Sequence, residues 1–543
     1  MGGARADWLE RIADRVVCHA AKRKGAGASL ICASGVSPSG EIHLGNLREV
    51  FTTHFVVEEL LSRGLPAVHL HSWDDYDRFR KVPEGFPASM EAFVGRPLCD
   101  VPDPDEQHES WAARFIHQFE RAAGELGVQA RWVRQSEKYQ AGAYRAGIER
   151  ALDHRVALFD VLSRFMTLRT PEQIAELRAS WWPVRIYSAN TGTDDTTVLG
   201  WDPATSTLQY RCNSSGEALS TCLADESRVK LLWKIDWPMR WAVEQVDFEP
   251  GGEDHASPGS SYTVGAQVVS HFDWVAPSFE AYGFVGMAGR TKMSSSTGTG
   301  ATPEFALGFL EPALVRWLYL RRPPRKKFNI EFGVDIWRQY DEWDALDRRV
   351  VADKATPLEA RVHRLALHPS AGSLPSPAVR LPFRSLTAAA DGSDGNREQV
   401  IRIAALSLEA PPDDLERALH PRLDRALGWV TQVLPDDERL SVRAEHDPAA
   451  FAALDATSQE AVRRLLAQMA DHWSLSGLTS LVYGVPKDMA GLPRDTPPTP
   501  ELKQAQRAFF VAVYQLLLGV ETGPRLPTLL LSLGEPRVRR LLG

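Results

Sequence analysis

The distribution of apolar and polar positions near the start of the chain predicts parallel β-structure. Ser29–Ser34 (SLICAS) has the pattern of a short buried strand, and a Gly/Ser/Pro turn follows at Gly35–Gly40. Asn46–Arg63 has the spacing of a helix that ends at Gly64, and Ala67–His71 predicts a second strand. Strand, turn, helix and strand make a βαβ unit, so we expect an α/β fold with a doubly wound parallel sheet.

A middle region interrupts this pattern, and we interpret residues 93–225 as an α+β insertion between two halves of the sheet. Its first part is helical in pattern, at Glu106–Leu126 and Tyr139–Leu162. Pro183–Arg211 then combines β-branched and aromatic residues with turn residues, which is typical of strands. We expect the second half of the sheet at residues 226–290.

The chain beyond Thr302 is mostly helical in pattern and predicts an all-α bundle. Thr499 and Pro500 offer an N-cap and a first-turn proline, and an apolar stripe then runs to a stop at Gly519. Two stretches, His368–Asn396 and Gly484–Pro498, are rich in loop-forming residues, so we expect long connections there.

Length and composition narrow the class of protein. A chain of 543 residues corresponds to three or four domains, and 44% hydrophobic with 24% charged residues is typical of a globular protein. Five scattered cysteines argue against a disulfide framework, and the N-terminus lacks the apolar core of a secretory signal. We therefore expect a cytoplasmic protein without a membrane span. The net charge of −8 excludes a basic coat for nucleic acid but not a local basic surface.

The strongest chemical signal is PSGEIHLGN, which lies between the first strand and its helix. Small residues allow the backbone to approach a phosphate closely, and the helix N-terminus presents free N–H groups. His43 and Asn46 are three apart in the first helical turn, so both can donate hydrogen bonds to a polyphosphate.

Two further segments strengthen a nucleotide-binding interpretation. GRTKMSSSTG, at Gly289–Gly298, is a loop of small hydroxylated residues with one lysine, which can fold over a triphosphate. GGEDH, at Gly251–His255, lies where the second half of the sheet ends in a loop, near the switch point at which parallel sheets bind ligands.

In this order the three segments resemble the class I aminoacyl-tRNA synthetases, with HLGN similar to their HIGH motif and KMSSS to their KMSKS loop. The flanking text ASGVSPSGEIHLGNLREV, WDDYDRFRKVP, LLWKIDWPMRWAVEQVDFEPGGEDH and FFVAVYQLLLGVETGPRL resembles the class I lysyl-tRNA synthetases from about residue 5 to the C-terminus. The resemblance implies a Rossmann-type catalytic core at 1–92 and 226–290, a connective insertion at 93–225, the KMSSS loop and stem-contact region at 291–345, and an α-helical anticodon-binding domain at 346–543.

The resemblance also implies the site residues of a lysine–tRNA ligase that uses ATP with Mg²⁺. Catalysis is expected from His43, Asn46 and Lys292. ATP would be bound by these three and by Pro38, Ser39, Gly40, Gly45, Gly252, Asp254, His255, Met293, Ser294, Ser295 and Ser296. Lysine would be bound by Gly35, Ser37, Trp233, His255 and Tyr282. Aromatic faces suit the lysine stem and its ammonium group. Asp236 and Glu253 are both candidates to neutralise that ammonium, and the sequence does not choose between them.

Departures from the family pattern concern one lysine and the zinc sites. Ser295 stands where KMSKS has its second lysine. Some relatives carry a D-x3-C-H-x5-H cluster, where this chain has Asp103, Gln107, His108 and Arg114, and a cysteine ribbon, where it has Ser188, Thr191 and Cys212. Structural zinc needs four N, S or O ligands. We therefore predict no structural zinc and no other resident metal.

Local basic residues suggest where tRNA binds. Arg321, Arg322, Arg325, Lys326 and Lys327 follow the KMSSS loop and are expected to contact tRNA phosphates. The expected partners are tRNA(Lys), L-lysine and ATP, with the protein a monomer. Two other interpretations remain open: a catalytically weak paralogue that binds tRNA or aminoacyl-adenylate, and a nucleotidyltransferase for small metabolites.

Overall fold

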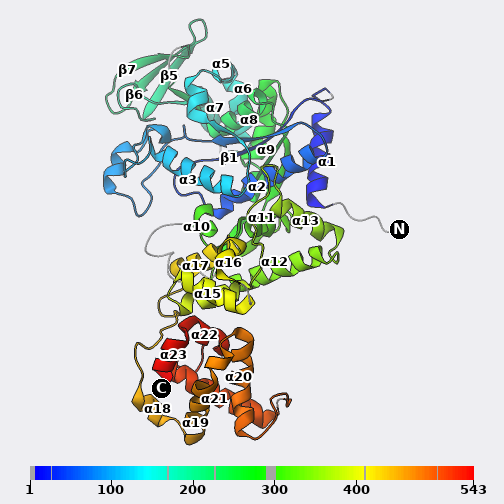
Figure 1. Ribbon diagram of the computed structural model, residues 1–543. Coiled ribbons are helices and arrows are strands. Elements are labelled where there is room, and N and C mark those ends of the chain that lie inside the picture. The colour runs from blue at the N-terminus through cyan, green and yellow to red at the C-terminus, as the bar shows by residue number, and fades with distance from the viewer. Residues whose placement is uncertain are drawn as a thin grey trace.

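A five-stranded parallel sheet forms the centre of the N-terminal part of the computed structural model, which describes residues 7–25, 27–167, 170–224, 228–288, 301–408, 411–497 and 499–543. The strand order is β10-β9-β1-β2-β3, so strands are added outward in one direction from β1 to β3 and in the other from β9 to β10, and the switch point lies between β1 and β9. This confirms the predicted doubly wound α/β core (Figure 1). The strands are β1 Leu30–Val36, β2 Ala67–Trp73, β3 Arg131–Arg134, β9 Phe248–Gly252 and β10 Ser278–Tyr282.

Helices cover both faces of this sheet because its strand residues alternate between two apolar clusters. Cys32 and Phe248 pack with the helices α1 (Trp8–Ala20), α2 (Leu44–Ser62) and α3 (Trp111–Glu125). Ala33 and Leu70 pack on the other face, against α8 (Trp233–Val243) and the short helix η4 (Val269–Phe272). Helix α9 (Ser261–Val268) lies on this face too.

Two sequence expectations in this core were wrong. The turn expected at Gly35–Gly40 begins later, because β1 continues through Val36 and pairs Gly35 with Ser72. The range 93–225 is not wholly an insertion, because β3 pairs with β2 inside the parallel sheet and α3 precedes it. β3 is a short edge strand with arginines at both ends, so it lacks the apolar run that identifies a buried strand.

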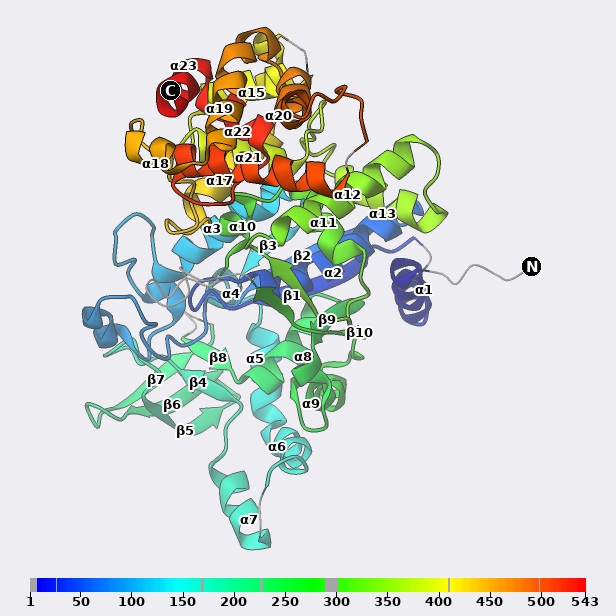
Figure 2. The same cartoon turned by 90° about the horizontal axis from the view of Figure 1, so that it is seen from below.

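The α+β unit that projects from the sheet begins at α4 and ends at β8, beyond the expected limit at residue 225. It has a three-stranded antiparallel sheet, β5-β6-β7, and a two-stranded one, β4-β8. Figure 2 shows helix α7 at the far end of this projection. The elements are α4 Gln135–Gln140, α5 Arg145–Asp153, α6 Arg155–Ser163, α7 Pro171–Ser180, β4 Val184–Ile186, β5 Thr196–Asp202, β6 Thr207–Cys212, β7 Ala218–Cys222 and β8 Val229–Leu231.

After the sheet, β11 (Val285–Ala288) pairs in parallel with β12 (Phe328–Glu331). Two helices, α10 and α11, lie between these strands along the chain, and the chain after β12 is helical. The connecting helices are α10 Pro303–Leu307, α11 Pro312–Leu320, α12 Ile336–Val351 and α13 Pro357–Leu367. The next helices along the chain are α14 Phe383–Gly392, α15 Arg397–Leu408, α16 Pro412–Leu419 and α17 Arg422–Gln432. A last group lies below them in Figure 1: α18 Pro448–Ala453, α19 Ala456–Gln468, α20 Leu475–Met489, α21 Pro500–Leu518, α22 Leu526–Leu533 and α23 Glu535–Leu542.

The start and stop signals predicted for α21 are confirmed. The Thr499 side chain accepts a hydrogen bond from the Leu502 N–H, and Gly519 ends the helix in the left-handed conformation. The loop expected at His368–Asn396 contains α14, which proline and glycine at its flanks conceal in the sequence.

The helical part does not begin cleanly at residue 346 and has no separate core. Helix α12 runs through that position, and one apolar cluster continues from Leu9 in α1 to Leu542 in α23. The buried Arg422 guanidinium also joins the regions, because it donates 2.8 Å hydrogen bonds to both oxygens of Asp344 and is paired with Glu311. A chain cut at 346 would expose these groups, so truncation there is a poor test of the helical part.

Candidate active site at the carboxyl edge of the sheet

The HLGN motif forms the N-terminus of α2, at the carboxyl end of β1. His43 is the N-cap residue, and its backbone N–H donates to the Asn46 side-chain oxygen across 3.1 Å. This contact fixes the Asn46 amide so that its amino group remains to donate elsewhere. His43 is exposed and Asn46 is half-buried, as side chains that meet a ligand should be. The positive end of the helix dipole at this N-terminus suits an anion.

Segments distant in sequence hold this helix end in place. The Leu44 N–H donates to the Ala301 carbonyl over 2.9 Å, and the Tyr319 hydroxyl donates to the Leu44 carbonyl over 2.7 Å. A side chain at Gly45 would have its Cβ 4.0 Å from the Val285 carbonyl oxygen. Val285 and Ala301 flank the KMSSS segment, so both of its neighbours lie at this helix end. Lys292, Met293, Ser294, Ser295 and Ser296 themselves lie outside the described residues.

The GGEDH motif ends β9, on the other side of the switch point. Gly251 has no room for a side chain, because a Cβ there would lie 2.8 Å from the Phe279 ring. The short helix η3 (Glu253–Ala256) follows, with the His255 side chain 35% exposed and that of Asp254 67% exposed. Open parallel sheets bind ligands in the crevice at this switch point.

Gly35 and Tyr282, two of the predicted lysine-binding residues, converge on Glu49, which sequence reasoning missed. The Gly35 N–H donates to Glu49 Oε1 over 2.8 Å, and the Tyr282 hydroxyl donates to Glu49 Oε2 over 2.7 Å. Burial raises the pKa of Glu49 to about 8, against the lowering effect of these two hydrogen bonds. Glu49 follows Asn46 by three residues, so helical spacing already places it on the same face of α2.

Trp233, on α8, and His255, on η3, belong to one aromatic group that is centred on Trp237. Trp233 stacks on Trp237 with ring centroids 5.2 Å apart, and His255 meets Trp237 edge-on at 5.7 Å. Trp237 and Trp241 are buried and pack in the apolar cluster that contains Ala33 and Leu70. Glu249 accepts the Trp241 indole N–H over 2.6 Å, and burial raises the pKa of Glu249 to about 7.

Asp236 is already neutralised within the protein. It is fully buried, its Oδ2 lies 2.6 Å from Lys230 Nζ and 3.1 Å from an Arg240 nitrogen, and the Tyr139 hydroxyl donates to it. The other sequence candidate, Glu253, is 39% exposed and pairs with Lys327 over 3.0 Å. Asp236 is therefore excluded as a free counter-ion for a ligand ammonium.

Arg48, on the buried face of α2, was also missed. Its guanidinium donates to the carbonyls of Tyr319, Pro323 and Pro324 over 3.3, 2.7 and 3.0 Å. It thereby ties the HLGN helix to the loop that carries the predicted tRNA-binding cations. An arginine within a helix gives no sequence signal for such burial, because arginines are mostly exposed.

The predicted tRNA-binding cations are not equivalent. Arg325, Lys326 and Lys327 are exposed in succession. Arg322 is half-buried: it stacks over the Phe328 ring and donates to the Leu318 carbonyl, so its role is at least partly structural. Arg321 lies over the Trp317 ring, 4.0 Å from its centroid, and pairs with Glu342.

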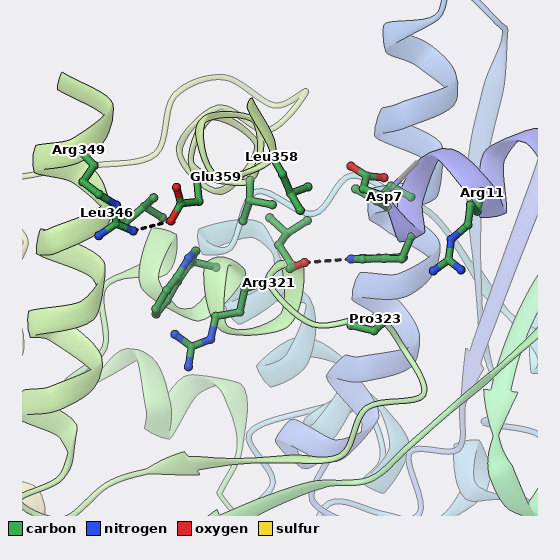
Figure 3. Close-up of a pocket in the computed structure, with 13 residues that line it drawn as sticks. Asp7, Arg11, Arg321, Pro323, Leu346, Arg349, Leu358 and Glu359 are labelled. Atoms are coloured by element: carbon green, nitrogen blue, oxygen red, sulfur yellow. Dashed lines mark hydrogen bonds and ion pairs between the residues drawn. The ribbon is translucent and has the colours of Figure 1, made fainter. Parts of the chain in front are cut away.

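Arg321 also lines a pocket of about 470 Å³ between α1, α11, α12 and α13. Figure 3 shows it with Arg349 paired to Glu359, and with Asp7 and Arg11 on the side of α1. None of the HLGN or GGEDH residues lines this pocket, so it is separate from the candidate active site.

At the two positions where some relatives carry zinc ligands, the side chains contact other groups of the protein. Arg114 places its own cation beside Asp103, with 3.0 Å between Nη1 and Oδ1. In the ribbon, Ser188 Oγ accepts from the Asn190 N–H over 3.2 Å, and Cys212 Sγ meets Ser214 Oγ at 3.4 Å. Within the described ranges, no group of three or more His, Cys, Asp or Glu side chains is arranged to hold a metal ion.

We expect exhaustive chelation of zinc to leave the enzymatic activity unchanged once Mg²⁺ is restored, because hydrogen bonds and an arginine occupy the would-be ligand positions. Activity before and after chelation, with elemental analysis of the purified chain, measures this. One tightly bound zinc per chain would contradict it.

The doubly wound sheet with HLGN and GGEDH on either side of its switch point has the arrangement of a class I aminoacyl-tRNA synthetase core. Residues 6–369 match the family described as tRNA synthetases class I (K). The chain is 43% identical to the lysine–tRNA ligase of Streptomyces coelicolor, over 99% of this chain and 98% of that one. It is 31% and 32% identical to the lysine–tRNA ligases of Pyrococcus horikoshii and Thermococcus kodakarensis, over 98% of this chain and 99% of each. The chain therefore belongs to the class I lysyl-tRNA synthetase family.

Proposed function

We propose that this protein joins L-lysine to tRNA(Lys) with ATP, as a lysine–tRNA ligase that works as a monomer in the cytoplasm. The observation that carries this proposal is the 43% identity to a lysine–tRNA ligase over nearly the full length of both chains. No helix within the described ranges has both the length and the apolar character to cross a bilayer.

In this proposal the lysine ammonium pairs with Glu49. Asp236 is saturated by Lys230, Arg240 and Tyr139, whereas the two donors to Glu49 within the described ranges, the Gly35 N–H and the Tyr282 hydroxyl, are both neutral. A carboxylate whose pKa burial has raised gains most from a cation, because the cation compensates for lost solvation. Trp233 would cover the aliphatic stem, and Ser37 and His255 would contact the α-amino acid end.

ATP with its Mg²⁺ would lie across the two motifs. The loop Pro38, Ser39, Gly40 and the first turn at Gly45 would approach the phosphates, and Gly252, Asp254 and His255 the adenosine. Contacts to the pyrophosphate would come from Lys292, Met293, Ser294, Ser295 and Ser296. Val285 and Ala301, which flank that segment, support this, because both lie at the N-terminus of α2.

No nucleophilic side chain is needed for the reaction. The lysine carboxylate attacks the α-phosphate, the bond to pyrophosphate breaks, and lysyl-adenylate remains. A ribose hydroxyl of the 3′-terminal adenosine of tRNA then attacks the acyl carbon and AMP leaves. His43, Asn46 and Lys292 would stabilise negative charge that grows on the phosphates, so the protein acts by positioning and electrostatics.

A charging assay with the intact protein tests the function. We expect radiolabelled lysine to be esterified to tRNA(Lys) only when ATP and Mg²⁺ are present. Absence of both charging and lysine-dependent pyrophosphate exchange in folded protein would reject the proposal and favour a binding paralogue.

We also propose that the C-terminal helices, beyond α17, recognise the anticodon. The HLGN and GGEDH motifs belong to the sheet, and the group α18–α23 lies at the opposite end of the molecule in Figure 1. An anticodon-swapped tRNA(Lys) is therefore expected to lower kcat/KM for charging by about tenfold or more, since each stacked base contributes about 1–3 kcal/mol. Pyrophosphate exchange should not change. Equal charging of the normal and swapped tRNA would contradict this assignment.

A further inference from the structure

Phe284 is an exposed aromatic ring at the rim of the candidate active site. It lies between the end of β10 at Tyr282 and the start of β11 at Val285, and it is 63% exposed. Exposed phenylalanines gain nothing from burial within the chain, so a ring in this position is available to another molecule.

A basic side chain is held beside this ring. The parallel register pairs Val285 with Phe328, which places Lys327 next to Phe284 on the neighbouring strand. Lys327 Nζ lies 5.6 Å from the centroid of the ring and 3.0 Å from Glu253 Oε2. The ion pair fixes the lysine, and Glu253 is the first residue of η3 in the GGEDH motif.

The ring is close to both halves of the site. Tyr282, two residues before it, donates to Glu49, and Val285, directly after it, turns its carbonyl towards Gly45 of HLGN. Arg325 and Lys326, both exposed, precede Lys327. An exposed aromatic ring and three basic side chains therefore lie together at the edge of the site.

This combination suits single-stranded nucleic acid. Proteins bind unpaired RNA by stacking bases on aromatic rings while basic residues follow the phosphates. A ring that is 63% exposed is a poorer match for the adenine of ATP, because small-molecule sites bury most of their ligand. We propose that Phe284, with Arg325, Lys326 and Lys327, stacks an unpaired base of the tRNA 3′ end as it enters the active site. This rests on the proposed function.

The test uses the full-length protein with Phe284→Ala, Phe284→Tyr and a control, Val243→Ala, which removes another exposed apolar side chain, 45% exposed at the end of α8. Each variant is measured for lysine-dependent pyrophosphate exchange. Each is also measured for binding to tRNA(Lys) and to the same tRNA without its unpaired 3′ nucleotides. Phe284→Ala should weaken binding of the complete tRNA about tenfold, the loss of one stacked base.

Phe284→Tyr should retain wild-type binding because the ring remains, and the shortened tRNA should bind equally to every variant. The KM values for ATP and lysine should not change. A raised KM for ATP in Phe284→Ala, or an equal loss of binding affinity for the complete and the shortened tRNA, would overturn the proposal. If wild type shows no lysine-dependent exchange, the ligase function fails, yet the comparison of the two tRNAs still tests whether Phe284 stacks a base.

Discussion

Replacement of His43 or Asn46 by alanine is expected to slow lysyl-adenylate formation by about 10²–10³-fold, the cost of one donor that stabilises transition-state charge. Both residues lie in the first turn of α2, where His43 is exposed and the Asn46 amide is fixed by the 3.1 Å contact with the His43 N–H. Because charge on the phosphates grows in the transition state, the loss should fall on the rate rather than on lysine binding.

Lysine-dependent pyrophosphate exchange, with binding of lysine measured separately, checks this result. Thr499→Ala is a matched control, since it also removes a side chain that satisfies a helix N-terminus but lies in α21. An exchange rate close to wild type in a folded Asn46→Ala variant would remove Asn46 from the proposed catalytic group.

Replacement of Glu49 by glutamine is expected to raise the KM for lysine about 100-fold, since truncation of one partner of a buried charge pair typically costs 2–5 kcal/mol. The amide keeps the shape and can still accept from the Gly35 N–H or the Tyr282 hydroxyl. The rise in the KM for lysine therefore measures the effect of removing the negative charge. Glu120→Gln is the control, because Glu120 is a half-buried glutamate that accepts the Trp73 indole N–H and is not among the predicted ligand contacts.

The same carboxylate predicts a pH dependence. Its pKa of about 8 in the free protein means that it is mostly protonated at pH 7 and must ionise to pair with the ammonium. Lysine should therefore bind more tightly as pH rises towards about 8, by about tenfold per unit at lower pH. This slope should be absent in Glu49→Gln. An equal slope in both proteins would show that another group titrates.

The sequence by itself determined much of the fold, because the deciding signals are local. The βαβ pattern around Gly64, the caps of α21 and the strand-like run after Pro183 all depend on neighbours within one or two turns. The motif text also led to the family, since HLGN and GGEDH combine residue type with order along the chain.

Elements without an apolar signature were missed for equally physical reasons. The edge strand β3 carries arginine at both ends, and its place beside β2 follows from sheet pairing rather than from its own sequence. The predicted domain boundary at residue 346 does not coincide with the end of a helix, because α12 continues through it, and one apolar cluster links the regions on both sides.

Only the tertiary structure decided which charges are free to act. Asp236 and Glu49 are both acidic residues near a motif. Lys230 and Arg240 neutralise Asp236, whereas Glu49 accepts hydrogen bonds from the neutral groups of Gly35 and Tyr282. Those partners lie between 4 and 233 residues away in the chain. The energy of a buried charge depends on its immediate surroundings in space, and those surroundings exist only after the chain has folded.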